Sequence, residues 1–515
     1  MADDSSLDCE RFGLRRFVDT LIEAGEVEIV EEPVALTEIA RRLDGNGKAV
    51  LFRRAGPEQA ELIGNILGSG PRIGLAFGVP RADVPEEINR RIRTKQPVVE
   101  VAPETAPMRE IVLTGDDADL TKLPVHLQHE MDGGPYISAS IDYVRDPGTG
   151  AMNAGIRRMM LRGPKEAGVD MTAPSDLQAI LRQVQATGGK LPVSYVVGSH
   201  PIDHLSASLR LPGDELELLA SLRGAPLPVV KGVTNDIPVP ADAEMVLEGY
   251  FDEAGWSEDE GPFGEFLGYY GIMKRNPVFH LTAICRRRDA LFQTVTISGV
   301  AIVNTETSNI GTVLTEVGAW EAIRTAVREP VAIYATPSSG GLFNLRASIR
   351  QRVPGEARNA IAALLGSLSD IKHVFLVDDD IDVTSDAQID WALATRFQAD
   401  RDLIVQGGFR AIPLDPSLEG SRTGAKAGFD LTLPFGLRDR IDMTVSVPPS
   451  FDGAAARFQT VEEALADGPK SLGELVAALG SDDGREIVRA LDEIRKAQGL
   501  IRDSDGRYSI AGSPG

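Results

Sequence analysis

The sequence predicts a mixed α+β and α/β protein that is divided into several domains. Between residues 111 and 299, short β-branched runs are separated by Gly, Pro and Asp turns, a pattern typical of a β-rich domain. Before and after that region, helical and strand patterns alternate, which is typical of α/β domains. The length of 515 residues agrees with this division, because a domain averages roughly 150 residues.

Residues 1–110 are expected to form an N-terminal α/β unit. Residues 12–42 have a helical rhythm that places apolar side chains such as Phe17 and Leu21 on one face. The apolar run at residues 49–53 has the length and composition of a short strand.

The next region, residues 111–305, is expected to form the β-rich domain. One helix interrupts it at residues 175–186, where Ser175 or Asp176 would cap the N-terminus. Four β-branched runs are expected to form strands: residues 137–144, 193–197, 278–284 and 291–297.

A strongly amphipathic helix is predicted at residues 309–328, within a linker at residues 306–330. Its apolar stripe consists of Val313, Val317, Trp320, Ile323 and Val327. A C-terminal α/β domain would follow at residues 331–450. Its buried strands are expected at residues 331–335 and 372–383, and a crossing helix at residues 356–368.

Residues 451–515 predict a small winged-helix-like unit. Helices are expected at residues 471–479 and 485–497, and a hairpin at residues 500–510. Many domains of this shape bind DNA, but residues 457–515 hold eight Lys and Arg against eleven Asp and Glu. The net charge of −3 favours a packing or interaction module over DNA contact.

The composition excludes several classes of protein. The chain holds 53 Lys and Arg and 76 Asp and Glu, a net charge of −23, which argues against nucleic acid or an anionic membrane as the main partner. Two cysteines cannot form a disulfide framework or a Cys-rich zinc site. The acidic first nine residues lack the apolar core of a signal peptide, and no apolar stretch is long enough for a membrane span. We expect a cytoplasmic protein.

Two clusters of polar residues and glycines are candidates for chemistry. In the first, the turn Asp132-Gly-Gly-Pro-Tyr136 is followed by Asn153 and Arg158, which could direct an amide and a guanidinium into one cleft. A Gly/Pro hairpin with surface arginines is the alternative. In the second, a Gly-Pro-x-Gly turn separates Glu260 from Glu265. Two carboxyls held close together split their pKa values, so that one stays protonated near neutral pH. An acidic surface loop is the alternative.

A third cluster, Asp378-Asp-Asp380, lies at the end of a predicted buried strand. It could bind a divalent cation, although a strand-end turn with solvated carboxylates is the more common structure. The six histidines include no zinc-binding spacing, and the chain has no P-loop, no G-x-S-x-G and no G-x-G-x-x-G after a strand.

Taken in order, these motifs resemble the UbiD family of decarboxylases, which use prenylated FMN. The resemblance rests on Leu123-Pro-Val-His126, Asp132-Gly-Gly-Pro-Tyr-Ile137, Asn153-x-Gly-Ile-x-Arg158, Val230-Lys231, Asn235-Asp-Ile-Pro-Val-Pro240, Glu244-x-Val-Leu-Glu-Gly249, Glu260-Gly-Pro-Phe-Gly-Glu265 and Asp378-Asp-Asp-Ile-Asp-Val383. It implies a split-barrel-like flavin-binding domain, a linker helix and a C-terminal α/β oligomerisation domain, with a homodimer as the expected assembly. The winged-helix-like tail is additional to the family pattern.

The resemblance also implies an activity, the reversible non-oxidative decarboxylation of an aromatic, heteroaromatic or α,β-unsaturated carboxylic acid. A flavin prenyltransferase would supply the cofactor, which acts as the electron sink. Glu265 would deliver the proton after CO2 leaves, Arg158 would hold the substrate carboxylate, and Glu260 would tune both. The segment 424–430 is expected to contribute to the substrate pocket.

By motif match, the flavin would contact Asn153, Ile156, Arg157, Arg158, Met171, Thr172, Ser175 and Asp176. A divalent cation (Mn2+ in the family, with K+ nearby) would bind Asn153 and Glu215. The family's third ligand is a His, and residues 171–176 contain none. Either Asp176 or water takes its place, or Asp176 only caps the helix.

Two other functions stay open at this level. One is a flavin-dependent oxidoreductase built on the same barrel. The other is a non-catalytic binding or regulatory protein that uses the tail for contacts. The set of Arg158, Glu260 and Glu265 argues against the second, because a binding protein has no need of a proton donor there.

Overall fold

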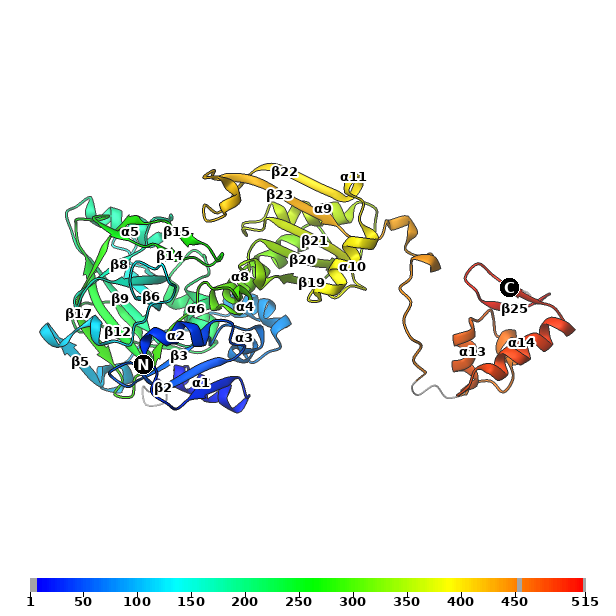
Figure 1. The fold of residues 1–515 in the computed structure, drawn as a ribbon, viewed down its shortest axis with the longest axis horizontal. Helices are drawn as coiled ribbons and strands as arrows, with labels where there is room; N and C mark the ends of the chain where they lie inside the picture. The colour runs from blue at the N-terminus through cyan, green and yellow to red at the C-terminus, as the bar shows by residue number, and fades with distance from the viewer. Residues whose placement is uncertain (1–6, 452–455, 513–515) are drawn as a thin grey trace. The chain divides into compact units, whose positions relative to one another are not determined.

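The computed structural model describes residues 7–451 and 456–512. The chain forms two compact units, Met1–Thr432 and Leu433–Gly515 (Figure 1).

A closed barrel of six antiparallel strands forms the core of the larger unit (Figure 1). The strands follow one another in the order β12-β9-β6-β7-β8-β17, and β17 pairs back with β12. Their bounds are β6 (Tyr136–Arg145), β7 (Met152–Leu161), β8 (Glu166–Val169), β9 (Leu191–Val197), β12 (Met245–Phe251) and β17 (Val278–Arg286). A further strand, β5 (Ile111–Thr114), pairs with β17.

Side chains along each strand point alternately to the two faces of the barrel wall. Both faces pack against apolar clusters, so both sets of side chains are apolar. In β9, Val193, Tyr195 and Val197 pack in one apolar cluster and Val196 packs in another. This double burial explains why the strands appear in the sequence as nearly continuous β-branched runs. The prediction of a β-rich domain is confirmed.

The prediction of a strand at residues 291–297 is mostly wrong. Only β18 (Phe292–Gln293) forms, and it pairs with the N-terminal sheet. The backbone N–H groups that follow are used elsewhere: that of Val295 donates to Ser138 Oγ (2.9 Å), and that of Thr296 donates to Glu306 Oε2 (2.9 Å). Side chains therefore replace a strand partner in this segment.

The N-terminal unit is an α/β layer, as predicted. Its elements are α1 (Leu14–Glu23), β1 (Val27–Val30), α2 (Leu36–Leu43), β2 (Ala49–Ala55), β3 (Ala60–Gly64), α3 (Gly70–Phe77), α4 (Val84–Ile92) and β4 (Val98–Glu100). The helical rhythm over residues 12–42 is interrupted by β1, a correction to the prediction. Gly25, at a φ of 73°, ends the first helical segment, and β1 then pairs with β2.

Short elements complete the region around the barrel. Three helices are α5 (Asp176–Gln185), α6 (Pro201–Ser206) and α7 (Glu215–Arg223). Strands β10 (Leu227–Lys231) and β11 (Pro238–Pro240) form a small sheet with β4. Two further pairs are β13 (Glu258–Glu260) with β16 (Lys274–Asn276), and β14 (Phe263–Gly264) with β15 (Tyr270–Gly271).

The linker helix α8 (Glu306–Arg324) starts and ends a few residues earlier than predicted. Its start is set by Thr305, which caps the N-terminus. The sheet that follows has the order β19-β20-β21-β23-β22. Its strands are β19 (Pro330–Ala335), β20 (Asn344–Ile349), β21 (His373–Asp378), β22 (Leu403–Arg410) and β23 (Thr423–Asp430), and its helices are α9 (Glu356–Leu365), α10 (Asp386–Arg396) and α11 (Ala399–Asp402).

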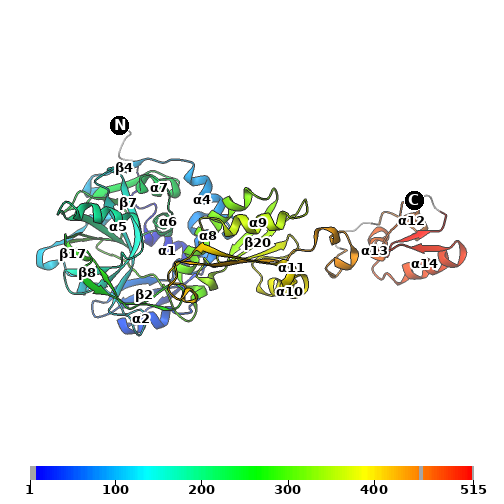
Figure 2. The same cartoon turned by 90° about the horizontal axis from the view of Figure 1, so that it is seen from above.

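This C-terminal α/β layer differs from the prediction in one strand. The unpredicted strand β20 lies between β19 and β21 in the sheet. The helix α9 therefore connects β20 to β21, whereas the prediction had it follow β19. The helices α8 and α9 pack on one face of the sheet and α10 on the other (Figure 2).

The second unit contains the predicted helices and hairpin. Its elements are α12 (Val461–Ala466), α13 (Leu472–Leu479), α14 (Arg485–Ala497), β24 (Leu500–Arg502) and β25 (Tyr508–Ile510). The helix α12 was not predicted, although Thr460 and Glu463 form a capping box at its start. The exact domain boundaries stay predictions. Within the residues that the structure describes, no helix is both long enough and apolar enough to cross a membrane.

Glu306 joins three segments at the start of α8. Its buried carboxylate accepts backbone N–H groups from Asn65 (3.1 Å), Leu67 (3.0 Å) and Thr296 (2.9 Å). The N-terminal unit, the end of the barrel domain and the linker helix therefore meet at one side chain.

We expect Glu306→Gln to lower the free energy of unfolding by about 1–3 kcal/mol, because the new amide would turn N–H groups toward backbone donors. Thermal unfolding of the full chain measures this change. Glu321→Gln, at an exposed position on the same helix, is the control and should unfold like the wild type. Equal unfolding temperatures for the two variants would contradict the role of Glu306.

Candidate active site

Arg158 lies at the centre of a largely buried ion-pair cluster. Its Nη2 lies 2.9 Å from Asp170 Oδ2, its Nε 3.1 Å from Glu260 Oε1, and its Nη1 3.2 Å from Glu265 Oε2. The guanidinium also lies over the ring of Phe263, 4.5 Å from the ring centroid. The structure thus brings together the three residues that the sequence analysis proposed as catalytic, and it adds Asp170.

Glu260 is fixed by three donors. Besides Arg158, the Tyr136 hydroxyl donates to Oε1 (2.9 Å), and Asn276 Nδ2 donates to Oε2 (3.1 Å). The side chain has no exposed surface. Burial, reinforced by the charge of Glu260, raises the pKa of Tyr136, so that its hydroxyl stays a donor.

Glu265 is the carboxyl of the cluster with a raised pKa. Burial raises the pKa of Glu265, and the charges of Arg158 and Lys274 oppose that shift without reversing it. Among the described residues, its Oε1 accepts no hydrogen bond, although Arg158 Nη1 lies 3.2 Å and Lys274 Nζ 3.9 Å away. The cluster contains three carboxyls and two cations. Protonation of one carboxyl therefore balances the charges of the cluster.

Asp170, Lys274, Asn276 and Tyr136 complete the cluster, and the sequence analysis assigned none of them a role. The charges of Arg158 and Lys274 outweigh burial and lower the pKa of Asp170 to about 2. Lys274 and Asn276 lie on β16, which pairs with the strand that carries Glu260. The register of that pairing is set across the intervening β14–β15 hairpin, so the spacing of the residues in the sequence does not show it. Of these four residues, only Tyr136 lies in a motif that stood out in the sequence, the turn that begins at Asp132.

The Asp132 turn and the Glu260–Glu265 turn pack directly against each other. The Gly133 N–H donates to Pro262 O (2.8 Å), and the Gly264 N–H donates to Asp132 Oδ1 (3.0 Å). A Cβ atom at Gly133 would lie 2.1 Å from Gly261 O, so only glycine permits this approach. Because Glu260 is 0% and Glu265 7% exposed, the acidic surface loop suggested as an alternative is wrong.

A second polar region surrounds Asn153 on β7. Its Nδ2 donates to Glu215 Oε2 (3.2 Å), and Glu215 also accepts the Ala154 N–H. Burial, together with the charges of Asp142 and Asp176, raises the pKa of Glu215 to about 7. Both carboxylate oxygens of Asp142 are buried without a hydrogen bond among the described residues, although Arg157 Nε lies 3.4 Å from Oδ1.

This crowding of carboxylates beside an amide has the chemistry of a site for a hard cation. The arrangement is incomplete in its geometry, because no three His, Cys, Asp or Glu side chains of the described residues converge as a ligand set. Asp142 is a member of this region that the sequence analysis missed. Asp142 could have been noticed in the sequence because it is a charged residue within the predicted strand at residues 137–144.

The other residues expected at the flavin flank these two regions. Ile156 and Arg157 lie half-buried on β7, between Asn153 and Arg158. Met171, Thr172, Ser175 and Asp176 lie between β8 and the first turn of α5. The Met171 N–H donates to Asn276 Oδ1 (3.0 Å), which ties this segment to the Arg158 cluster.

Ser175, not Asp176, caps α5. The Gln178 N–H donates to Ser175 Oγ (3.3 Å), whereas Asp176 is the exposed first residue of the helix. The interpretation of Asp176 as the helix cap is therefore wrong.

The Asp378–Asp380 cluster is neutralised by arginines. Asp379 pairs with Arg350 (2.7 Å), and Asp380 pairs with Arg396 (2.6 Å). These contacts leave a strand-end turn, the interpretation that the sequence favoured.

The histidines near the site are packed side chains. His126 is buried, its Nε2 lies 3.0 Å from Thr294 Oγ1, and burial lowers its pKa to about 4. His129 Nδ1 lies 3.1 Å from Asp132 Oδ2.

Three family models match the chain in succession. They are the N-terminal domain (residues 18–92), the Rift-related domain (residues 99–300) and the C-terminal domain (residues 308–431) of 3-octaprenyl-4-hydroxybenzoate carboxy-lyase, UbiD. None of these three models extends into the second unit of the chain.

Curated and solved relatives agree with these models. The chain is 32% identical to the anhydromevalonate phosphate decarboxylase of Methanosarcina mazei, over 81% of this chain and 95% of that protein. The UbiD-class enzyme HmfF of Pelotomaculum thermopropionicum, solved with FMN, is similar with a TM-score of 0.80 and 32% identity, over 85% of this chain and 97% of HmfF. An evolved dimeric form of HmfF, solved with prenylated FMN, gives a TM-score of 0.76 and 30% identity, with the same coverage.

The fold, the buried Arg158 cluster and the three successive family matches lead to the same conclusion. The chain belongs to the UbiD family of carboxy-lyases.

Proposed function

We propose that this protein catalyses the reversible, non-oxidative decarboxylation of an aromatic, heteroaromatic or α,β-unsaturated carboxylic acid, with prenylated FMN as its cofactor. The observation that supports this most directly is the contact of Arg158 with Glu260 and Glu265 in one buried cluster. The relatives that hold FMN or prenylated FMN support the choice of cofactor.

In this proposal, Arg158 binds the substrate carboxylate, because a guanidinium forms two parallel hydrogen bonds to a carboxylate. Tyr136 and Asn276 hold Glu260, and Glu260 in turn fixes the guanidinium in position. Prenylated FMN, when bound, supplies the electron sink for the electron pair of the broken bond.

The proton comes from the Glu265 carboxyl. The bond between the substrate carbon and its carboxylate breaks, CO2 leaves, and the Glu265 proton is transferred to the carbon that carried the carboxylate. Glu265 ends as a carboxylate and regains a proton from water. Its raised pKa supports this role, because a general acid must be protonated at the working pH.

The cofactor would be held by Asn153, Ile156, Arg157, Arg158, Met171, Thr172, Ser175 and Asp176. Mn2+, or a similar divalent cation, would bind Asn153, Glu215 and Asp176, with K+ nearby. The crowded carboxylates around Glu215 support a cation there.

We also propose a homodimer, a flavin prenyltransferase as supplier of the cofactor and a cytoplasmic location. The scarcity of cysteine supports a reducing compartment.

Glu265→Gln should retain the flavin and lose turnover by about 10²-fold or more, because glutamine cannot donate the proton. The protein is co-expressed with a flavin prenyltransferase, and the flavin spectrum and CO2 release are measured. Glu258→Gln, at an exposed position on β13, is the control and should stay active. An active Glu265→Gln enzyme would refute the proton donor, and oxidation of NAD(P)H without CO2 release would favour the oxidoreductase.

Asp170→Asn should move the alkaline limb of the pH dependence of kcat/KM to lower pH. The charge of Asp170 raises the pKa of Glu265, so its removal lowers that pKa. A general acid loses activity as the pH rises through its pKa. Flavin content is measured in parallel, and a limb that stays in place or moves to higher pH would contradict this assignment.

Asp176→Ala should lower the Mn content of the purified protein, because it removes one of three proposed ligands. Elemental analysis of protein grown with added Mn2+ measures this content. Glu217→Ala, at an exposed position on α7, is the matched control. Unchanged occupancy in Asp176→Ala would reject the ligand role.

A further inference from the structure

A cavity of about 270 Å³ lies between the loop that follows Glu265 and the C-terminal sheet. Leu267 and Tyr269 line it from the barrel side, and the Tyr269 carbonyl accepts the Glu265 N–H (2.9 Å). From the other side, Asn344 and His373 line it at the starts of β20 and β21. The cavity therefore begins at the turn that directly follows the proposed proton donor, Glu265.

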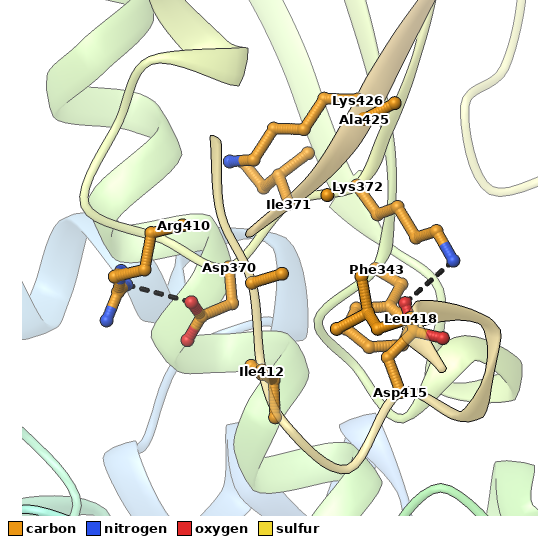
Figure 3. Close-up of a pocket in the computed structure, with 12 residues that line it drawn as sticks. Phe343, Asp370, Ile371, Lys372, Arg410, Ile412, Asp415, Leu418, Ala425 and Lys426 are labelled. Atoms are coloured by element: carbon orange, nitrogen blue, oxygen red, sulfur yellow. Dashed lines mark hydrogen bonds and ion pairs between the residues drawn. The ribbon is translucent and has the colours of Figure 1, made fainter. Parts of the chain in front are cut away.

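The size and walls of the cavity suit one substituted ring or a short unsaturated chain. Leu267, Ile302 and Phe343 supply apolar wall. An apolar cavity of about 150 Å³ holds benzene, so this one has room for a ring with a substituent. A neighbouring cavity of about 20 Å³, which Gly424 lines, holds about one water molecule (Figure 3).

The charges that line the larger cavity cancel. Its only charged lining residues, within the described part of the chain, are Lys372 and Asp415, which pair at 2.7 Å (Figure 3). Lys372 Nζ also lies 2.7 Å from Ser417 Oγ. Burial raises the pKa of Asp415, but its bonds to Lys372 and Ser417 outweigh burial and lower that pKa. Asp415 therefore keeps its charge and neutralises the lysine.

His373 contributes a neutral hydrogen-bonding group. Its Nδ1 lies 2.9 Å from Asn344 Oδ1, so Nδ1 carries the proton. Burial, with the charge of Lys372, lowers the pKa of His373, which keeps the ring neutral at neutral pH. Nε2 is then an acceptor, and it has no hydrogen-bond partner among the described residues.

We propose that this cavity receives the end of the substrate remote from its reacting carboxylate, and that it selects acids whose far end is an uncharged hydrogen-bond donor such as a hydroxyl. The inference rests on the proposed decarboxylation. A second carboxylate or a phosphate would need a cation that is not already compensated, because burial of an unpaired charge is costly. The Lys372–Asp415 pair offers none, whereas His373 Nε2 accepts from a hydroxyl.

The test compares matched acids on the cofactor-loaded enzyme. 4-Hydroxybenzoic acid is paired with benzene-1,4-dicarboxylic acid, and 4-hydroxycinnamic acid with 4-carboxycinnamic acid. We expect kcat/KM to favour the hydroxy acid of whichever pair is turned over by about tenfold or more. If neither pair is turned over, dissociation constants read from the flavin spectrum should give the same preference.

Two variants locate this preference. Asp415→Asn leaves Lys372 uncompensated and should shift the ratio about tenfold toward the dicarboxylic acid. Asp370→Asn is the matched control, because Asp370 pairs with Arg410 (2.8 Å) and lines only the small cavity. His373→Phe should remove the advantage of the hydroxy acid over its unsubstituted parent.

A wild-type preference for the dicarboxylic acids, or a ratio that Asp415→Asn leaves unchanged, would overturn the inference. Such a result would leave the decarboxylation itself intact. Binding of the hydroxy acids without CO2 release from any acid would instead reject the proposed function.

Discussion

The guanidinium of Arg158 is the group on which the rest of the site depends. Only 13% of its side chain is exposed, and a cation withdrawn this far from water is stabilised by the carboxylates around it. Asp170 follows β8, whereas Glu260 and Glu265 lie on one turn, and each of the three carboxylates lies within 3.2 Å of the guanidinium. The same contacts that stabilise the cation fix the three carboxyls relative to one another. Stability and function are thus combined in one cluster.

The barrel and its turns make this convergence possible. The closed order of six strands holds β7, and with it Arg158, in a rigid wall. The turn that carries Glu260 and Glu265 is held against the Asp132 turn by one hydrogen bond between backbone groups and one from a backbone N–H to the Asp132 carboxylate. The absence of a Cβ at Gly133 permits this close approach. A small residue at one position therefore sets the place of two carboxyls far along the chain.

The C-terminal sheet completes the region beyond Glu265. The strands β20 and β21 pair in parallel, which aligns Asn344 with His373 at the edge of the larger cavity. Binding sites in open α/β sheets usually lie at the carboxyl ends of strands. Here the carboxyl end of β21 is occupied by Asp–Arg pairs, and the cavity lies at its amino end. The neighbouring barrel domain supplies the opposite wall.

Apolar periodicity and short glycine-rich motifs are local features of a sequence. They were therefore enough to predict the class of fold, the order of its parts and the set of Arg158, Glu260 and Glu265. We did not predict β20, although its alternation of polar and apolar residues is a strand pattern, or the loss of most of the strand at residues 291–297. The convergence of Asp170, Lys274 and Asn276 on Arg158 depends instead on how the strands pair in the folded chain, which no local pattern shows. The tertiary structure also decided that Asp415 neutralises Lys372, since burial and pairing of charges arise only when the chain is folded.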